Sequence, residues 1–331
     1  MHIHMKRTLY ISININLERI IKMKKIAYMI AALPLALFAK SASADISVSG
    51  SGSVAYTDAG GNTSTTMGGG VSFAMSTTTD GGVTISASSS TSNDDDSAGS
   101  SSAVTGVTNL SFGFANGSIS VGQDIGVADG VGKVGELAHY NDNQTGITNS
   151  TGLGDDEGDG ISASTSIGDM TLGVAYVYDG AGAGNVDGAT TTSQSVSLSM
   201  PVGTGSLTVA SASDDVAGVN MNEVGVAYTM AAAGGTLSLG FTGTDGDTAA
   251  SEGESVSAAF STTIGGASVG IGYTGHDVNS TTAQQTDITI SSSLGGGASI
   301  FAEYSNVSGT VAAETSALSN NTLAVGTSVS F

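Results

Sequence analysis

From residue 45 onwards the sequence consists of short segments in which apolar and polar residues alternate. In residues 170–178 the even-numbered positions are apolar, and in residues 267–273 the odd-numbered positions are. A repeat of two residues places successive side chains on opposite faces of an extended strand, and a helix cannot produce it. Disordered sequence does not produce it either. The chain is therefore predicted to be all-β, with strands that carry one apolar and one polar face.

The connections between these segments alternate between tight turns and longer loops. Asn-Gly and Gly-Gly pairs supply the positive φ angles that short hairpins need. Seven tight turns are predicted, at residues 78–82, 116–117, 168–169, 203–205, 231–235, 265–266 and 295–297. Eight longer, acidic or polar loops are predicted, at residues 58–64, 91–101, 124–158, 180–190, 214–220, 245–253, 276–284 and 307–320. Short turns at one end of sixteen antiparallel strands and long loops at the other are typical of a transmembrane β-barrel of the bacterial outer membrane.

An even number of strands brings the first and last strands to the same end, where they can pair and close the sheet. In hydrocarbon every backbone N–H and C=O must be paired, and a closed barrel achieves this without an edge strand. Several alternating runs are only about eight or nine residues long, which suits the thin outer membrane. The last run, residues 322–331, is apolar at most alternate positions and ends on Phe331. This ending resembles the C-terminal signal of bacterial outer-membrane barrels, so Phe331 is the predicted barrel assembly signal.

The N-terminal part of the chain has the pattern of a cleaved export signal. Three lysines at 22–25 precede an apolar run at 26–39, and small residues at 41–44 form an A-x-A type site. This pattern predicts a Sec signal peptide with cleavage before Asp45. A short membrane anchor is the alternative, and the small residues at the cleavage site argue against it.

Met23 is the expected start of the protein, because residues 1–22 share no pattern with the rest of the chain. The predicted division is therefore a signal region at 1–44, with a spurious upstream extension, and a barrel at 45–331.

Beyond residue 44 the chain is strongly acidic. It has 28 acidic residues and one basic residue, Lys133, which gives a formal charge of −27. Phosphate contacts need lysine or arginine, so binding to nucleic acid is excluded. Cysteine is absent, which excludes disulfides, cysteine-ligated zinc and a thiol nucleophile.

Catalytic machinery is not expected. His139 and His276 lie far apart, both in predicted loops, and no G-x-S-x-G sequence occurs beyond residue 44. Neither a metal site with histidine spacing nor a serine-histidine triad can be argued from these residues. The protein is therefore predicted not to be an enzyme and to require no cofactor.

Several segments resemble the general diffusion porins of Alphaproteobacteria, the Rhodobacter type. The similarity is clearest in Val71-Ser-Phe-Ala-Met-Ser76 followed by Thr79-Asp-Gly-Gly82. It recurs in residues 110–122 and 294–300 and in the terminal strand, and it extends loosely over residues 45–331. The resemblance implies an outer-membrane barrel of sixteen strands, usually a homotrimer, whose third long loop folds into the lumen and narrows it. It also implies passage of small hydrophilic solutes and, in some members, calcium binding.

One departure from the family concerns charge. Members usually set arginines on the barrel wall against carboxylates on the third loop, which creates a transverse field. Residues 45–331 contain no arginine, and the second strand reads Thr65-Thr66-Met67 where members often carry basic residues. A transverse field is therefore expected to be weak or absent.

The third long loop, residues 124–158, is the expected constriction loop. Carboxylates in a narrow passage with low-dielectric walls raise the local concentration of cations and repel anions. For any single residue, a solvated loop charge with little effect is the alternative. The candidate residues at the constriction are Asp124, Asp129, Lys133, Glu136, His139 and Asp142.

A dense acidic run later in the same loop is a candidate calcium site. Asp155, Asp156, Glu157 and Asp159 surround a glycine and could supply the six to eight oxygens that calcium takes. The run does not fit the EF-hand pattern, and an exposed, solvated loop is the alternative.

These observations predict an exported outer-membrane channel for passive diffusion of small hydrophilic solutes and ions, with a preference for cations. Its expected partners are outer-membrane lipid and lipopolysaccharide, the barrel assembly machinery and two further copies of the chain. The alternative is a secreted, calcium-dependent surface adhesin or surface-layer protein built as a β-solenoid. A solenoid needs a fixed repeat, and the loops here vary in length instead.

Overall fold

The structure is a computed structural model of the 331-residue chain. It describes residues 45–59, 61–94, 109–123, 125–128, 130–135, 137, 159–179, 191–216, 219–247, 252–278, 281–309 and 320–331. These residues contain no helix that is long and apolar enough to cross a bilayer.

Sixteen β-strands account for most of the described residues. The shortest strands are β4 and β5, with six and seven residues, and the longest is β2, with 17. The strands are β1 (Asp45–Ala59), β2 (Asn62–Thr78), β3 (Thr84–Asp94), β4 (Asn109–Phe114), β5 (Gly117–Gln123), β6 (Asp159–Ile167), β7 (Met170–Asp179), β8 (Thr191–Val202), β9 (Gly205–Val216), β10 (Val219–Ala232), β11 (Gly235–Gly246), β12 (Gly253–Ile264), β13 (Ala267–Val278), β14 (Thr281–Gly295), β15 (Ala298–Gly309) and β16 (Asn320–Ser330).

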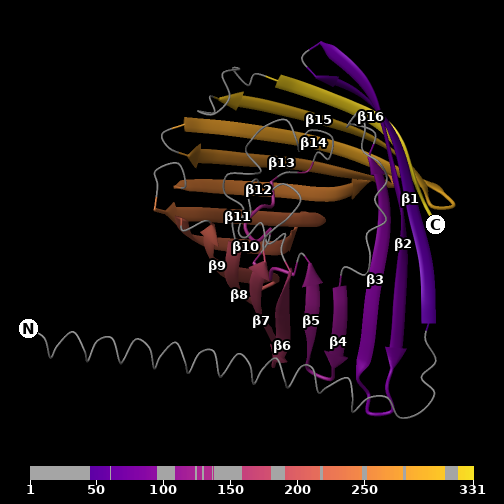
Figure 1. Ribbon diagram of the computed structural model, residues 1–331. Coiled ribbons are helices and arrows are strands. Elements are labelled where there is room, and N and C mark those ends of the chain that lie inside the picture. The colour runs from indigo at the N-terminus through magenta and orange to yellow at the C-terminus, as the bar shows by residue number, and fades with distance from the viewer. Residues whose placement is uncertain are drawn as a thin grey trace, which may run out of the picture.

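Each strand pairs antiparallel with its neighbours in sequence, and the first strand pairs with the last. The β1–β16 ladder runs from Ser51 opposite Ser330 to Ala59 opposite Thr322. Figure 1 shows the two ends of the chain's sheet brought side by side, with indigo β1 next to yellow β16. The closed, sixteen-stranded antiparallel barrel predicted from the alternation is confirmed. A β-solenoid, the architecture of the alternative adhesin, does not have this topology.

The alternation sorts side chains between the two faces of the wall. On the outside of the barrel, large apolar side chains are exposed: Val256 is 54%, Val329 52% and Ile271 50% exposed. The inward positions between them hold small or polar residues such as Ser257, Gly270 and Ser328. A wall with this arrangement presents hydrocarbon to lipid and hydroxyl groups to water.

All seven predicted tight turns are present at one end of the barrel, at or within two residues of the predicted positions. In most of them a glycine has a positive φ angle, for example 61° at Gly265 and 88° at Gly266. The β10–β11 turn differs, because Ala233 has a φ of 48° ahead of Gly234 at 77°. Ala233 is the one non-glycine residue in the described part of the chain with a positive φ.

The predicted strand lengths are wrong at the opposite end of the barrel. The predicted loop 276–284 is mostly strand, because β13 continues to Val278 and β14 begins at Thr281. The predicted loops at 58–64, 214–220 and 245–253 shrink in the same way. Beyond the apolar band both faces of a strand meet water, so hydrophobic alternation stops although the backbone ladder continues. His276, predicted to lie in a loop, therefore lies in β13 with its side chain buried on the inner face.

The barrel lumen and the loop inside it as the candidate functional site

The inner wall is lined by hydroxyl groups that bond to one another across strands. Ser111 and Ser120 share a hydrogen bond of 2.6 Å between β4 and β5, and Ser299 and Ser328 share one of 2.7 Å between β15 and β16. Ser118 and Ser164 are 2.9 Å apart between β5 and β6. Short side chains keep the bore wide, and their remaining hydrogen-bonding capacity keeps it wet.

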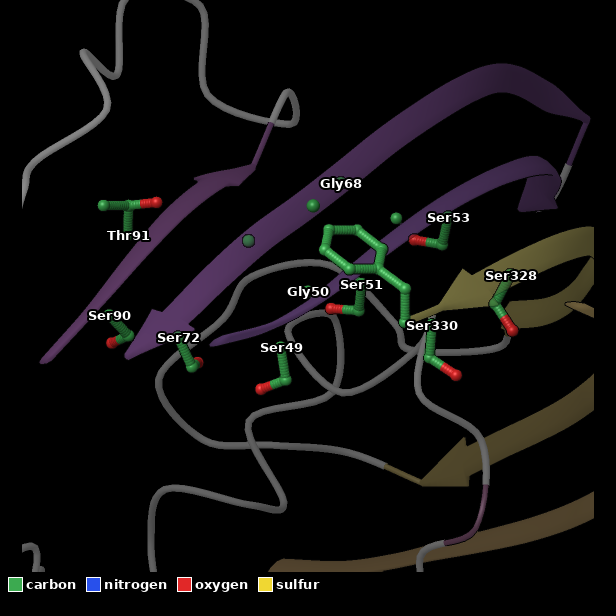
Figure 2. Close-up of a pocket in the computed structure, with 14 residues that line it drawn as sticks. Ser49, Gly50, Ser51, Ser53, Gly68, Ser72, Ser90, Thr91, Ser328 and Ser330 are labelled. Atoms are coloured by element: carbon green, nitrogen blue, oxygen red, sulfur yellow. The ribbon is translucent and has the colours of Figure 1, made fainter. Parts of the chain in front are cut away.

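One part of this wall forms a neutral hollow of about 700 Å³ on β1, β2, β3 and the end of β16. Figure 2 shows the serines that line it, spread over these four strands. Its lining consists of glycines, serines, Thr91 and Phe331, namely Ser49, Gly50, Ser51, Gly52, Ser53, Gly68, Gly69, Gly70, Ser72, Ser90, Thr91, Ser328, Ser330 and Phe331. We call its lumen-facing serines and glycines the neutral wall; the ring of Phe331 has the outward phase of Val329. The neutral wall offers hydrogen bonds and no charge to a passing solute.

The wall from β9 to β15 is acidic instead. Asp214 on β9, Glu223 on β10, Asp287 on β14 and Glu303 on β15 occupy inward positions, and each is at most 8% exposed. We call these four residues the acidic wall. None of the four was among the predicted site residues. Glu223, Asp287 and Glu303 fall on the polar phase of an alternating strand, and that phase was the signal that could have found them. Asp214 falls in the predicted loop 214–220, where alternation gave no signal.

The described residues of the third loop between 125 and 137 run along the inside of the barrel against several strands in turn. The first part of this segment packs on β6 and β7. Ile125 is 7% exposed and lies over Gly160, and Val127 lies over Gly173. The backbone N–H of Val127 donates to the Ser195 hydroxyl on β8 at 3.3 Å.

The middle of the segment packs on β9 and turns. Ala128 is fully buried against Ala210 and Ala212, and Val131 covers this cluster. The Val131 N–H donates to the Ala128 carbonyl at 3.1 Å, and the Lys133 N–H donates to the Gly130 carbonyl at 3.1 Å. Two successive tight turns therefore keep the backbone of the segment close to the barrel wall at this point.

The last part crosses β11 to β14. The Ser257 hydroxyl on β12 donates to the Gly132 carbonyl at 2.7 Å and accepts the Val134 N–H at 3.2 Å. The Leu137 N–H donates to the Asp287 carboxylate on β14 at 2.9 Å. Asp287 also accepts two hydrogen bonds from the Gln285 amide, at 3.0 and 3.1 Å. The described part of the third loop therefore lies in the lumen, as the resemblance implied, and is fixed to the wall by hydrogen bonds.

The sequence profile of the Gram-negative porin family matches residues 31–329. The chain belongs to this family. As a Gram-negative porin it is a channel protein of the outer membrane. No curated protein matches the sequence closely enough to be compared with it.

Solved porin structures have the same fold. A mutant of the Rh. blastica porin with two introduced tryptophans has a TM-score of 0.61 and 18% sequence identity, covering 87% of this chain and 100% of that one. A loop-deletion mutant of OmpT, an outer membrane protein of Vibrio cholerae, has a TM-score of 0.68 and 11% identity, covering 87% and 99%. At these identities the likeness concerns the fold.

Most of the predicted constriction residues of this porin lie outside the described residues. Lys133 is described: it is half-buried and lies between Gly132 and Val134 on the segment that crosses the acidic wall. The residues outside the described ranges are Asp124, Asp129, Glu136, His139 and Asp142.

The predicted calcium ligands cannot be placed together. Asp155, Asp156 and Glu157 lie outside the described residues, and Asp159 is the first residue of β6. Within the described ranges no group of three or more His, Cys, Asp or Glu side chains is placed to hold a metal ion. Calcium binding stays a prediction.

The terminal residue of the porin lies at the seam that closes the barrel. The Phe331 N–H donates to the Gly50 carbonyl and the Gly50 N–H donates to the Phe331 carbonyl, both at 3.0 Å. The ring of Phe331 lies over Gly50, and a Cβ at this position would have to displace the ring. The same pairing of an aromatic ring with a cross-strand glycine recurs on the outer face, with Phe260 over Gly235. Such rings protect strand glycines that have no side chain of their own to pack.

Proposed function

We propose that this porin is a cation-selective channel for the passive diffusion of small hydrophilic solutes. The observation that carries the proposal is the sign of the lumen charge. Four buried carboxylates line the acidic wall, and Lys133 is the single basic residue beyond position 44.

The physical reason is that fixed charges act strongly inside a narrow bore. Field lines are confined by the low-dielectric wall, so carboxylates attract cations over more of the cross-section than they would on an open surface. At physiological ionic strength the screening length is about 8 Å. A cation close to the acidic wall is therefore stabilised, and an anion is repelled.

The opposite wall supports the same proposal. The neutral wall carries hydroxyl groups where a basic cluster would have produced a transverse field. A lumen with carboxylates on one side and no basic cluster facing them discriminates chiefly by the sign of a solute's charge. Uncharged polar solutes that fit the bore should pass without preference.

The test is a reversal-potential measurement across planar bilayers in a KCl gradient. Wild-type protein should favour K⁺ over Cl⁻, and a preference for Cl⁻ would refute the proposal. Replacing Glu223→Gln and Glu303→Gln together should shift the reversal potential towards zero. The matched control is Glu254→Gln, because Glu254 is an exposed carboxylate on the outer face of β12 and should leave selectivity unchanged.

Third-loop carboxylates are proposed to add to this preference. Replacing Asp129, Glu136 and Asp142 together by Asn should lower the K⁺ preference further. An unchanged reversal potential in that variant would assign the selectivity to the acidic wall alone.

We also propose export and assembly steps for this porin. Cleavage before Asp45 is proposed from the basic residues, the apolar run and the small residues at 41–44 that precede it. Mass spectrometry of protein from outer membranes should therefore give a mature chain that begins at Asp45. The proposed partners are lipopolysaccharide, the assembly machinery acting on Phe331, and two copies of the same chain. Crosslinking followed by electrophoresis without heating would reveal a trimer or exclude it.

Calcium binding at Asp155, Asp156, Glu157 and Asp159 is proposed from their sequence pattern. Chelation should then lower the melting temperature of the assembled porin, and added calcium should restore it. Replacing the three adjacent acidic residues at 155–157 should remove this response.

A further inference from the structure

The segment 125–137 touches the barrel wall backbone to backbone at two places. The Gly132 carbonyl oxygen lies against Gly240 on β11, and the Gly135 carbonyl oxygen lies against Gly272 on β13. Both wall glycines occupy inward positions, as their alternation with outward Leu239 and Ile271 requires.

Neither wall glycine could carry a side chain in this arrangement. A Cβ at Gly240 would overlap the Gly132 carbonyl oxygen, and one at Gly272 would overlap the Gly135 carbonyl oxygen. The obstructing atoms are backbone, so no change of rotamer relieves the overlap. The reverse also holds, since a Cβ on Gly132 or Gly135 would meet a carbonyl oxygen of the wall. The loop therefore lies as close to the wall as a polypeptide can.

Hydrogen bonds prevent the segment from sliding along the wall. Ser257, between the two contacts, bonds both the Gly132 carbonyl and the Val134 N–H, at 2.7 and 3.2 Å. Asp287, beyond the second contact, accepts the Leu137 N–H at 2.9 Å. A group inserted beneath the loop would therefore lift it towards the axis of the barrel.

We propose that Gly240 and Gly272 set the width of the pore. They are positioning residues: by having no side chain they let the third loop lie flat, and the cross-section left beside the loop fixes the largest solute that passes. Ser257 and Asp287 hold the loop in that place. The inference rests on the proposed channel function but is independent of the sign of selectivity.

The experiment compares single-channel conductance at one KCl concentration, together with liposome swelling in neutral sugars of increasing size. Gly240→Ala and Gly272→Ala should lose conductance relative to wild type, and Gly240→Val should lose more. The largest sugars that enter wild-type liposomes should be excluded first. The matched control is Gly113→Ala, because Gly113 faces inward on β4 and an added Cβ would find its nearest atoms at 3.7 Å. That variant should conduct like wild type.

A second pair of variants should act in the opposite direction. Ser257→Ala and Asp287→Ala release the loop from the wall and should give larger, noisier openings. Asp287→Asn keeps an acceptor for the Leu137 N–H and should restore quiet, wild-type openings. A loss of barrel stability alone would not lower the conductance of the glycine variants and raise that of the releasing variants.

Folding is checked for every variant by the shift in electrophoretic mobility between unheated and heated samples. If Gly240→Val does not fold, Gly240→Ala and the two releasing variants decide the question. Folded Gly240 and Gly272 variants with wild-type conductance and an unchanged sugar limit would overturn the inference. A reversal potential that favours Cl⁻ would overturn the proposed cation selectivity and leave this inference standing.

Discussion

At the scale of single residues, the barrel depends on where a side chain is missing. Gly50 accommodates the ring of Phe331, and Gly240 accommodates the backbone of the third loop. A glycine within a strand costs about 0.5–1 kcal/mol relative to alanine, so these contacts offset a real cost. Ala233 shows the opposite situation, a Cβ at a position where a glycine or asparagine would fit better.

The strain at Ala233 can be tested by substitution. Its φ of 48° places its Cβ near the next carbonyl, which costs roughly 1–2 kcal/mol for an ordinary L-residue. Ala233→Asn would create the Asn-Gly pair that two-residue hairpins favour and should stabilise the barrel by roughly 0.5–1 kcal/mol. Thermal unfolding in detergent measures the gain. Thr204→Asn, in the β8–β9 turn at a residue without positive φ, should give none.

The seam pairing of Phe331 is a second residue-scale prediction. Gly50→Val would occupy the space of the ring and should lower the temperature at which the barrel loses its fast electrophoretic mobility. Gly52→Val is the control, because a Cβ there would have 3.7 Å of clearance. Equal losses in the two variants would argue against a special role for the ring.

At the scale of elements, each strand contains an apolar band and a polar extension beyond it. The seven turns could be located from the sequence because each predicted turn contains a glycine between two alternating segments. Sequence alternation missed the extension of strands such as β13, since polar residues on both faces look like a loop. It also could not reveal that Gly240, Ser257 and Asp287 contact one loop, because their alignment follows from the register of four neighbouring strands. The acidic residues of the third loop lie outside the described part, and their role stays a prediction.

The polar extensions of β10 and β11 are joined by hydrogen bonds beyond the apolar band. The exposed Asp247 carboxylate, just past β11, accepts hydrogen bonds of 3.1 Å from the backbone and side-chain N–H groups of Asn220 on β10. These two bonds hold the pKa of Asp247 below its ordinary value, and the bond from the Asn220 backbone has the larger effect. Because the pKa is lowered on folding, the stabilisation is complete above the ordinary value and is lost as the pH falls through the lowered one.

Asp247→Asn should therefore melt at a lower temperature than wild type at neutral pH. The difference should shrink to nothing in acid, where the wild-type carboxyl is protonated as well. Thermal unfolding of both proteins across the acidic range measures it. A difference that stays constant with pH would show that charge is not involved.

At the scale of the whole molecule, the lumen is divided between a neutral wall on β1, β2, β3 and β16 and an acidic wall on β9 to β15. The described part of the third loop lies mainly along the acidic side, facing a wall of hydroxyl groups across the bore. Discrimination then depends on how far the field of the buried carboxylates extends into the bore. This distance depends on the salt concentration, because ions in solution screen the field of the carboxylates.

The preference for K⁺ should accordingly weaken as the salt concentration rises. The screening length falls from about 30 Å at 0.01 M to about 3 Å at 1 M ionic strength. Reversal potentials at a constant KCl ratio and increasing total concentration should give a falling K⁺/Cl⁻ permeability ratio. Glu223→Gln with Glu303→Gln should show a flatter dependence. A ratio independent of salt would point to selection by size.

The ladder between β1 and β16 also dictates an order of events in the life of the protein. A ribosome makes β1 first, yet β1 finds its second neighbour only in β16, the last strand of the sheet to be made. Until then every nascent copy has a bare hydrogen-bonding edge that could template aggregation. Ring formation therefore has to wait for β16, and a copy lacking that strand would remain an open sheet whatever the quality of the rest.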